Sequence, residues 1–209
     1  MTAVISEFSW TERELRIFSM EDFAGRMTEI RAQIQPKLRA IGERLREPMN
    51  QLCGQPCYPH VAKHLRRTVN PPPETWVAFS PSPRGYKQYC HYAFVVSLGG
   101  VHARIIVNSE APDRIQQAER LRHSTGNLMG TFQAVHLRCY EPWDCQGLPV
   151  LVDHSEKFWQ QCADRLSLKT GGLDLGIGFA GRELTTLTEA KLIVAFEQLQ
   201  PLYRVLIKQ

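Results

Sequence analysis

The sequence predicts an α+β fold, a two-layer single domain with a mainly antiparallel sheet and helices packed on one face. Helical spacing of apolar residues dominates the chain up to residue 53. Strand-like runs joined by short turns follow, and then strands and helices in mixed order. This order is typical of helices that cover one face of an antiparallel sheet. We find no linker that separates domains, so we expect one domain over 1–209, with a helical part at about 9–53 and a mixed sheet and helix part at about 58–209.

The composition is that of an ordinary globular protein. A chain of 209 residues can bury a core without disulfides or a metal. No run approaches the roughly 18 apolar residues of a membrane span. The first ten residues lack the basic start and apolar core of a signal peptide. We therefore expect a cytoplasmic protein with reduced cysteines and with no membrane contact, cofactor or metal, and we leave its oligomeric state open.

Two capping boxes predict helix starts. Ser9 and Glu12 have the spacing in which the two side chains satisfy free backbone donors, and Thr186 and Glu189 repeat it before the closing helix. Between them, apolar stripes predict helices over 21–34 and from Pro36 to about 52. The second of these helices carries a charged face, which we interpret as solvated: Arg39, Glu43, Arg46 and Glu47.

A β-hairpin is the clearest local pattern. Two strand-like runs, 89–98 and 101–108, flank Gly99-Gly100, which predicts a two-residue turn. That turn places Leu98 opposite Val101 and Phe94 opposite Ile105, with an apolar face and a polar face. Further strands are expected at 75–79, 132–140, 148–152 and 173–179, helices at 112–122 and from Asp153 or Ser155 to 166, and a loop at 126–130.

Cations, imidazoles and aromatic rings are most concentrated at 58–91. Arginine offers a planar fork of donors that matches phosphate or carboxylate, and lysine offers a point charge. We therefore predict a basic, loop-rich pocket that binds an anion. Its predicted ligand-binding residues are Lys63, Arg66, Arg67, Asn70, Arg84, Tyr86 and Lys87.

Several interpretations of this cluster stay open. One is a binding domain for a phosphate-bearing ligand, such as a nucleotide or a nucleic-acid end, on which Tyr86 stacks. Another is an enzyme for a phosphorylated small molecule, with His60, His64 or His91 as general acid or base. A third is a solvated basic loop without a ligand. The net charge of +4 is too small to indicate a dedicated nucleic-acid binder.

The second face of the hairpin supplies a further alternative, a protein-interaction module that uses a half-open sheet face. Gly176 and Gly178 would leave this face bare, so that a ligand or another backbone could approach closely. Its polar residues, the last three only if their strands pair in the same sense, are His91, His102, Arg104, Asn108, His136, Arg138 and Asp174.

Two other motifs are rejected. Cys53, Cys57, His60 and His64 are zinc-ligand types, but their spacing matches no standard zinc finger and prolines interrupt it. The glycines at 176–181 match G-x-G-x-x-G, but they fall within a strand pattern rather than in a turn before a helix.

The chain resembles the YktB-like family of uncharacterised bacterial proteins. The resemblance rests on Tyr-Pro-His-Val-Ala-Lys-His at 58–64, Arg-Arg-Thr-Val-Asn-Pro-Pro at 66–72, Thr-Trp-Val-Ala-Phe at 75–79 and Arg-Gly-Tyr-Lys at 84–87. It extends to 34–38 and 202–204. It implies one α+β domain with an antiparallel sheet and a histidine at the position of His91, and it implies no assigned activity.

Overall fold

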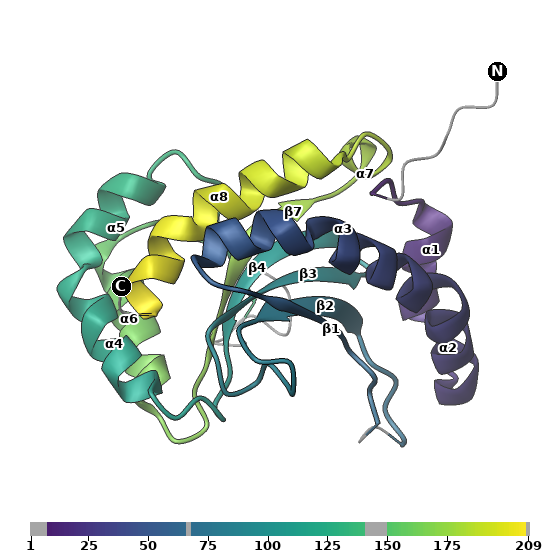
Figure 1. Ribbon diagram of the computed structural model, residues 1–209, viewed down its shortest axis with the longest axis horizontal. Coiled ribbons are helices and arrows are strands. Elements are labelled where there is room, and N and C mark those ends of the chain that lie inside the picture. Colours follow the sequence, from purple (N-terminus) through teal and green to yellow (C-terminus); the bar gives the residue numbers. More distant parts are fainter. Residues whose placement is uncertain (1–7, 66–67, 141–149, 208–209) are drawn as a thin grey trace.

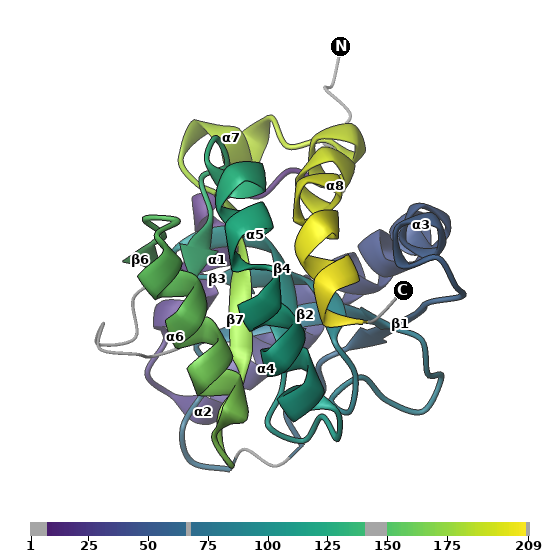
Figure 2. The same cartoon turned by 90° about the vertical axis from the view of Figure 1, so that its left-hand side faces the viewer.

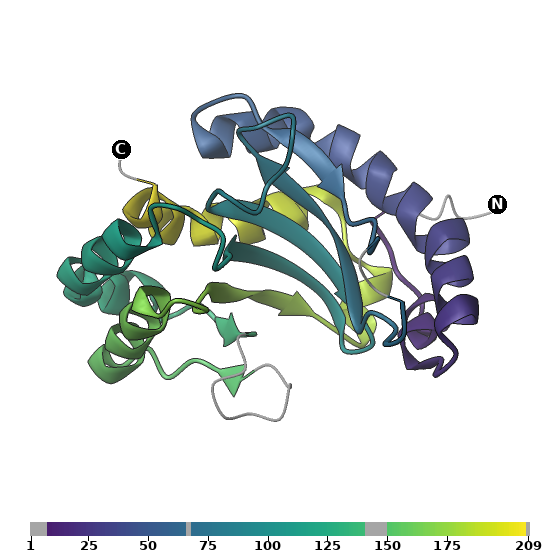
Figure 3. The ribbon, with the colours of Figure 1, turned by 90° about the horizontal axis from the view of Figure 1, so that it is seen from below.

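The computed structural model describes residues 8–65, 68–140 and 150–207. An antiparallel sheet forms one layer, and α3 and α8 lie side by side across one of its faces (Figure 1). The helices α4, α5 and α6 gather at one end of the sheet (Figure 2). Seen from below, the second face of the sheet is turned toward the viewer, with the described helices behind or around it (Figure 3). The predicted α+β class with a mainly antiparallel sheet is confirmed.

The N-terminal part is helical, as predicted, with one cap misplaced. The helix α1 begins after Thr11 rather than Ser9, because Thr11 and Glu14 form the capping box. Pro36 does not break the helical path, since it lies in the first turn of α3, where a missing N–H costs nothing. The elements are α1 (Glu12–Arg16), η1 (Ile17–Ser19), α2 (Phe23–Glu29), the π-helical η2 (Ile30–Ile34) and α3 (Gln35–Cys53).

In the described part of the chain the sheet has seven strands in the order β1-β2-β3-β4-β7-β5-β6. The pairs between neighbours are antiparallel. The strand β1 therefore lies at one edge and pairs with β2 alone among the described strands. The strands are β1 (Tyr58–Val61), β2 (Glu74–Ser80), β3 (His91–Ser97), β4 (Gly100–Val107), β5 (Arg138–Cys139), β6 (Val150–Leu151) and β7 (Leu173–Phe179).

The predicted hairpin exists, but its register differs. Ser97 pairs with Gly100, so the two-residue turn is Leu98-Gly99 rather than Gly99-Gly100. Gly100 belongs to β4 with φ of 127°, a conformation that other residues rarely adopt, and a Cβ there would lie 2.3 Å from the Phe179 carbonyl oxygen. Phe94 consequently faces Ala103 instead of Ile105. The two faces keep their predicted membership because the change is an even number of residues.

Three predictions about the second half of the chain are wrong. The expected loop at 126–130 is part of a helix, and the expected strand at 132–140 is reduced to two residues. The closing helix is capped by Thr188, whose side chain accepts from the Lys191 N–H, rather than by Thr186. The Ser155 cap is confirmed. The remaining helices are α4 (Arg114–His123), α5 (Thr125–Phe132), α6 (Glu156–Ser167), α7 (Arg182–Thr185) and α8 (Glu189–Leu206).

The main core lies between the sheet and α3 and α8. Tyr92 of β3 stacks on Tyr203 of α8 with ring centroids 4.6 Å apart, and Phe196 packs edge-on to Tyr92. Gly42 of α3 lets the helix approach the sheet, since a Cβ there would lie 3.0 Å from Pro59 and Val77. Among the described residues no helix has the length and apolar character that crossing a membrane requires.

Candidate functional site

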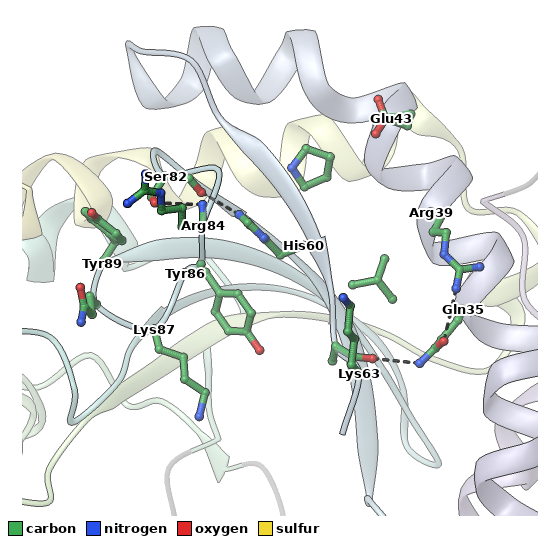
Figure 4. Close-up of a pocket in the computed structure, with 15 residues that line it drawn as sticks. Gln35, Arg39, Glu43, His60, Lys63, Ser82, Arg84, Tyr86, Lys87 and Tyr89 are labelled. Atoms are coloured by element: carbon green, nitrogen blue, oxygen red, sulfur yellow. Dashed lines mark hydrogen bonds between the residues drawn. The ribbon is translucent and has the colours of Figure 1, made fainter. Parts of the chain in front are cut away.

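A groove of about 1070 Å³ follows the edge strand β1. The helix α3 forms one wall with Gln35, Arg39 and Glu43, and the β2–β3 loop at 82–89 forms the other. The residues 59–63 form the floor between them (Figure 4). We call this feature the β1 groove.

Local hydrogen bonds shape both walls of the β1 groove. The three α3 residues are spaced four apart, so they share one face of the helix. The Gln35 side-chain amide donates to the Ala62 carbonyl oxygen at 2.9 Å and ties α3 to the end of β1. In the loop wall, the Ser80 hydroxyl donates to the Gly85 carbonyl oxygen at 2.9 Å, with the Ser82 carbonyl oxygen 3.2 Å away, and holds the turn after β2.

Three of the predicted cations line the β1 groove: Lys63, Arg84 and Lys87. Lys87 forms an exposed ion pair with Glu110 at 3.2 Å. Within the described residues, no ion pair or hydrogen bond occupies the Lys63 Nζ or the Arg84 guanidinium. A ligand anion would therefore meet two cations without displacing a protein carboxylate from them.

Arg39 is a fourth cation, and it comes from the helix. Its guanidinium donates to the Gln35 side-chain oxygen at 3.4 Å, a weak bond that leaves most of its donors for solvent or a ligand. Glu43 is the carboxylate among the described lining residues. The charge of the β1 groove is thus clearly positive.

Tyr86 is the aromatic centre of the loop wall. Its ring lies 5.0 Å from the His91 ring, 5.9 Å from His60 and 6.4 Å from Trp76. Burial raises the pKa of the Tyr86 phenol. The ring is therefore packed from several sides, and stacking of Tyr86 on a ligand stays a prediction for its remaining surface.

The predicted acid–base candidates occupy three different environments. His60 donates from Nε2 to the Ser82 carbonyl oxygen at 2.8 Å and lines the β1 groove. His64 lies 2.9 Å from the Thr75 hydroxyl and packs edge-on against Trp76. His91 is 1% exposed and donates from Nδ1 to the Tyr89 carbonyl oxygen. Burial lowers the pKa of His91 to about 4, so its ring is neutral at pH 7.

The other predicted residues lie outside the β1 groove or outside the part of the chain that the structure describes. Arg66 and Arg67 lie beyond the described residues. Asn70 is exposed and does not line the β1 groove. Sequence reasoning missed Arg39 and Glu43, which we had assigned to a solvated helix face. Their spacing of four was visible in the sequence, but nothing local indicated that this face turns toward β1.

The second face of the sheet holds a separate cluster around Arg104. This side chain is 3% exposed and donates to both Glu74 carboxylate oxygens, at 2.9 and 3.3 Å, and to Asp174 at 3.1 Å. Its guanidinium also lies 3.6 Å from the Tyr140 ring centroid. Although burial opposes the charge, Asp174 and Glu74 outweigh it and raise the pKa of Arg104. We call this group the Arg104 cluster.

Two glycines make room for the Arg104 cluster rather than for a ligand. A Cβ on Gly176 would lie 2.8 Å from Arg104 Cγ, and one on Gly178 would lie 2.9 Å from His102 Nδ1. That nitrogen lies 2.8 Å from the Tyr140 hydroxyl. The expected bare patch is therefore filled by side chains. Of the other residues expected on this face, Asp174 joins the cluster whereas His136 is exposed.

The fold defines an α+β protein with an antiparallel sheet, and a groove follows its edge strand. The family model described as a domain of unknown function, DUF1054, matches residues 10–203. A UPF0637 protein of Bacillus cytotoxicus is 33% identical over 203 residues, which are 92% of this chain and 94% of that protein. One from Macrococcus caseolyticus is 30% identical over 208 residues, covering 95% of this chain and 100% of that protein.

A third relative, from Staphylococcus carnosus, is 43% identical over 88 residues, or 42% of this chain and 43% of that protein. The chain therefore belongs to the DUF1054 family of uncharacterised bacterial proteins. The resemblance to the YktB-like family is confirmed by these matches. The names of these relatives assign no activity.

Proposed function

We propose that this chain is a cytoplasmic anion-binding domain whose β1 groove holds a phosphate-bearing ligand, such as a nucleotide or a nucleic-acid end. The observation that carries the proposal is the meeting of Arg39, Lys63, Arg84 and Lys87 in one groove. They come from a helix, a strand end and a loop that are far apart in the sequence. Cations brought together in this way would repel one another, and a bound anion would relieve that repulsion.

The roles follow from the contacts. Arg84 and Arg39 would offer planar donor forks to phosphate oxygens, and Lys63 would add a point charge. Lys87 is shared with Glu110 and would contribute less. The β1 groove is open and its cations are exposed, so salt would screen the interaction.

The enzymatic alternative has weaker support. His91 is buried beneath Tyr86 and does not line the β1 groove. His60 does line it, but its Nε2 proton is used in the bond to Ser82. Its Nδ1 would be the position for a proton-transfer role.

The test is calorimetric titration with inorganic pyrophosphate at two salt concentrations. We expect binding that weakens with salt, and a loss of about tenfold or more in the K63A/R84A double variant. The matched control is K157A/K169A, which removes two exposed lysines elsewhere on the surface and should bind like the wild type. Equal binding by both double variants, or no binding by the wild-type protein, would refute the proposal.

A further inference from the structure

The floor of the β1 groove is the free edge of a sheet. The Ala62 N–H donates to the Trp76 carbonyl oxygen at 2.9 Å, so the N–H of Ala62 is directed toward β2. In an antiparallel ladder hydrogen-bonded pairs alternate with pairs whose N–H and C=O groups point away from each other. Val61, which is opposite Val77, therefore directs its N–H and C=O away from β2 and into the β1 groove.

The β3–β4 hairpin gives the same alternation of inward and outward backbone groups, counted from the neighbouring strands. Ser97 and Gly100 close a two-residue turn, which makes them a hydrogen-bonded pair between β3 and β4. Alternation then directs the backbone N–H and C=O of Phe94 toward β2, where Phe94 is paired with Val77. The backbone groups of Val77 are used by β3, so those of Val61 have no partner among the described strands. Among the described residues no hydrogen bond occupies the Val61 N–H or C=O.

We infer that the occupant of the β1 groove is an extended segment of a partner polypeptide that carries a phosphorylated side chain and adds to the sheet as a strand beside β1. This inference rests on the proposed function, because it names the kind of molecule that brings the phosphate. A strand edge recognises a peptide backbone through the regular spacing of amides, which a nucleic acid lacks. The cations of both walls complement the phosphate charge.

The side chains of the added strand would reach both walls. A peptide residue opposite Val61 shares the face of Val61 and points toward α3, where Arg39 lies. Its neighbours share the face of His60 and point toward the loop wall, where Arg84 and Tyr86 lie. We place the phosphorylated residue on the loop side, because the Arg84 guanidinium there has no partner among the described residues.

Pro59 limits this pairing and protects the edge. The backbone of Pro59 also faces away from β2, but it offers a carbonyl oxygen and no N–H, so we expect strand addition to be centred on Val61. Proline on an edge strand also discourages pairing between copies of the same protein. The peptide consequently depends on its charge as well as on its backbone, which fits an edge flanked by cations on two walls.

The first experiment uses a short peptide of alternating valine and threonine with one central phosphothreonine. Two further versions carry equal numbers of N-methyl groups on alternate amides, in one phase or the other. In fluorescence anisotropy, one phase should weaken binding about tenfold, because its methyl groups replace the donors that face Val61, and the other should not. Equal binding by the two N-methylated versions would overturn the inference.

The second experiment changes the protein. Val61→Pro removes the outward N–H while leaving the β1–β2 hydrogen bonds in place, and Val61→Thr is the control that keeps the N–H and a branched side chain. We expect V61P to bind the phosphopeptide about tenfold more weakly than V61T. Should V61P fail to fold, the comparison of N-methylated peptides decides alone.

The outcomes separate the two proposals. Pyrophosphate and phosphopeptide binding that is lost in K63A/R84A but unaffected by V61P and by N-methylation keeps the anion groove and removes the added strand. Equally tight binding of the unphosphorylated peptide, or tighter binding of a 5′-phosphorylated oligonucleotide, also overturns the inference. No binding of any of these probes overturns both proposals.

Discussion

The Arg104 cluster and the β1 groove both hold cations beside the same sheet, but the surroundings of these cations differ. The Arg104 side chain is 3% exposed and binds two carboxylates. The Lys87 side chain is 51% exposed and forms an ion pair with one carboxylate, that of Glu110. A buried cation must be compensated within the protein, because removing it from water costs more than any single contact returns. An exposed cation needs no such compensation and remains available to a ligand. Burial, rather than residue type, therefore distinguishes a structural cation from a candidate ligand contact.

The largest effect is expected from R104M. It removes the cation that binds both the Glu74 and the Asp174 carboxylates. We expect the free energy of unfolding in urea to fall by about 3–5 kcal/mol. A loss below about 1 kcal/mol would show that the Arg104 cluster contributes no more to stability than a surface ion pair. The K63A/R84A variant is the matched comparison, with an expected change within about 0.5 kcal/mol.

Acid should destabilise the protein through its buried histidines. Burial lowers the pKa of His91 from 6.5 to about 4, so the unfolded chain takes up a proton first as the pH falls. The contribution of His91 to stability is fully present above pH 6.5 and falls by roughly 3 kcal/mol as the pH drops toward 4.

His102, whose pKa is lowered to about 3 by burial and by Arg104 and Arg138, acts in the same direction. Urea unfolding at several pH values should show a shallower decline in H91N than in the wild-type protein. A decline of the same steepness in both would contradict the depressed pKa of His91.

A smaller effect is expected from G178A. The new methyl group would lie 2.9 Å from His102 Nδ1 and 3.3 Å from the Tyr140 hydroxyl, so one of these side chains must move. We expect a loss of about 1–3 kcal/mol in thermal or urea unfolding. G85A is the control, because no atom lies within 4 Å of its added carbon. A loss in G85A that matches the loss in G178A would indicate a backbone effect instead of crowding.

The smallest effect is expected from K87A. Its partner Glu110 is 47% exposed, and such surface pairs contribute about 0–1 kcal/mol. The free energy of unfolding should therefore change by less than about 0.5 kcal/mol. Pyrophosphate binding should weaken less in K87A than in K63A/R84A. A stability loss comparable with that of R104M would remove the contrast between the two regions.

Part of the fold follows from local patterns in the sequence. Alternation along β3 and β4 predicts which side chains face the core, and this membership survives the change in register because the shift is even. The register itself depends on Gly100, where a Cβ would collide with the Phe179 carbonyl oxygen of β7, a strand distant in the sequence. The expected loop at 126–130 is helical because tertiary packing of Leu128 overrides the low helix propensity of its glycines.

For the candidate site, too, one part follows from the sequence and another depends on the tertiary structure. Of the residues that the sequence singles out at 58–91, Lys63, Arg84, Tyr86 and Lys87 line the β1 groove, and their binding role stays a prediction. Only the tertiary structure adds Arg39, because a helix face that looks solvated in sequence is turned toward β1 by the packing of Gly42 on Pro59. Only the tertiary structure buries Arg104 and His91 while leaving Arg84 exposed. The sequence by itself determines which groups carry charge, and the packing of distant segments decides which of those charges meet water.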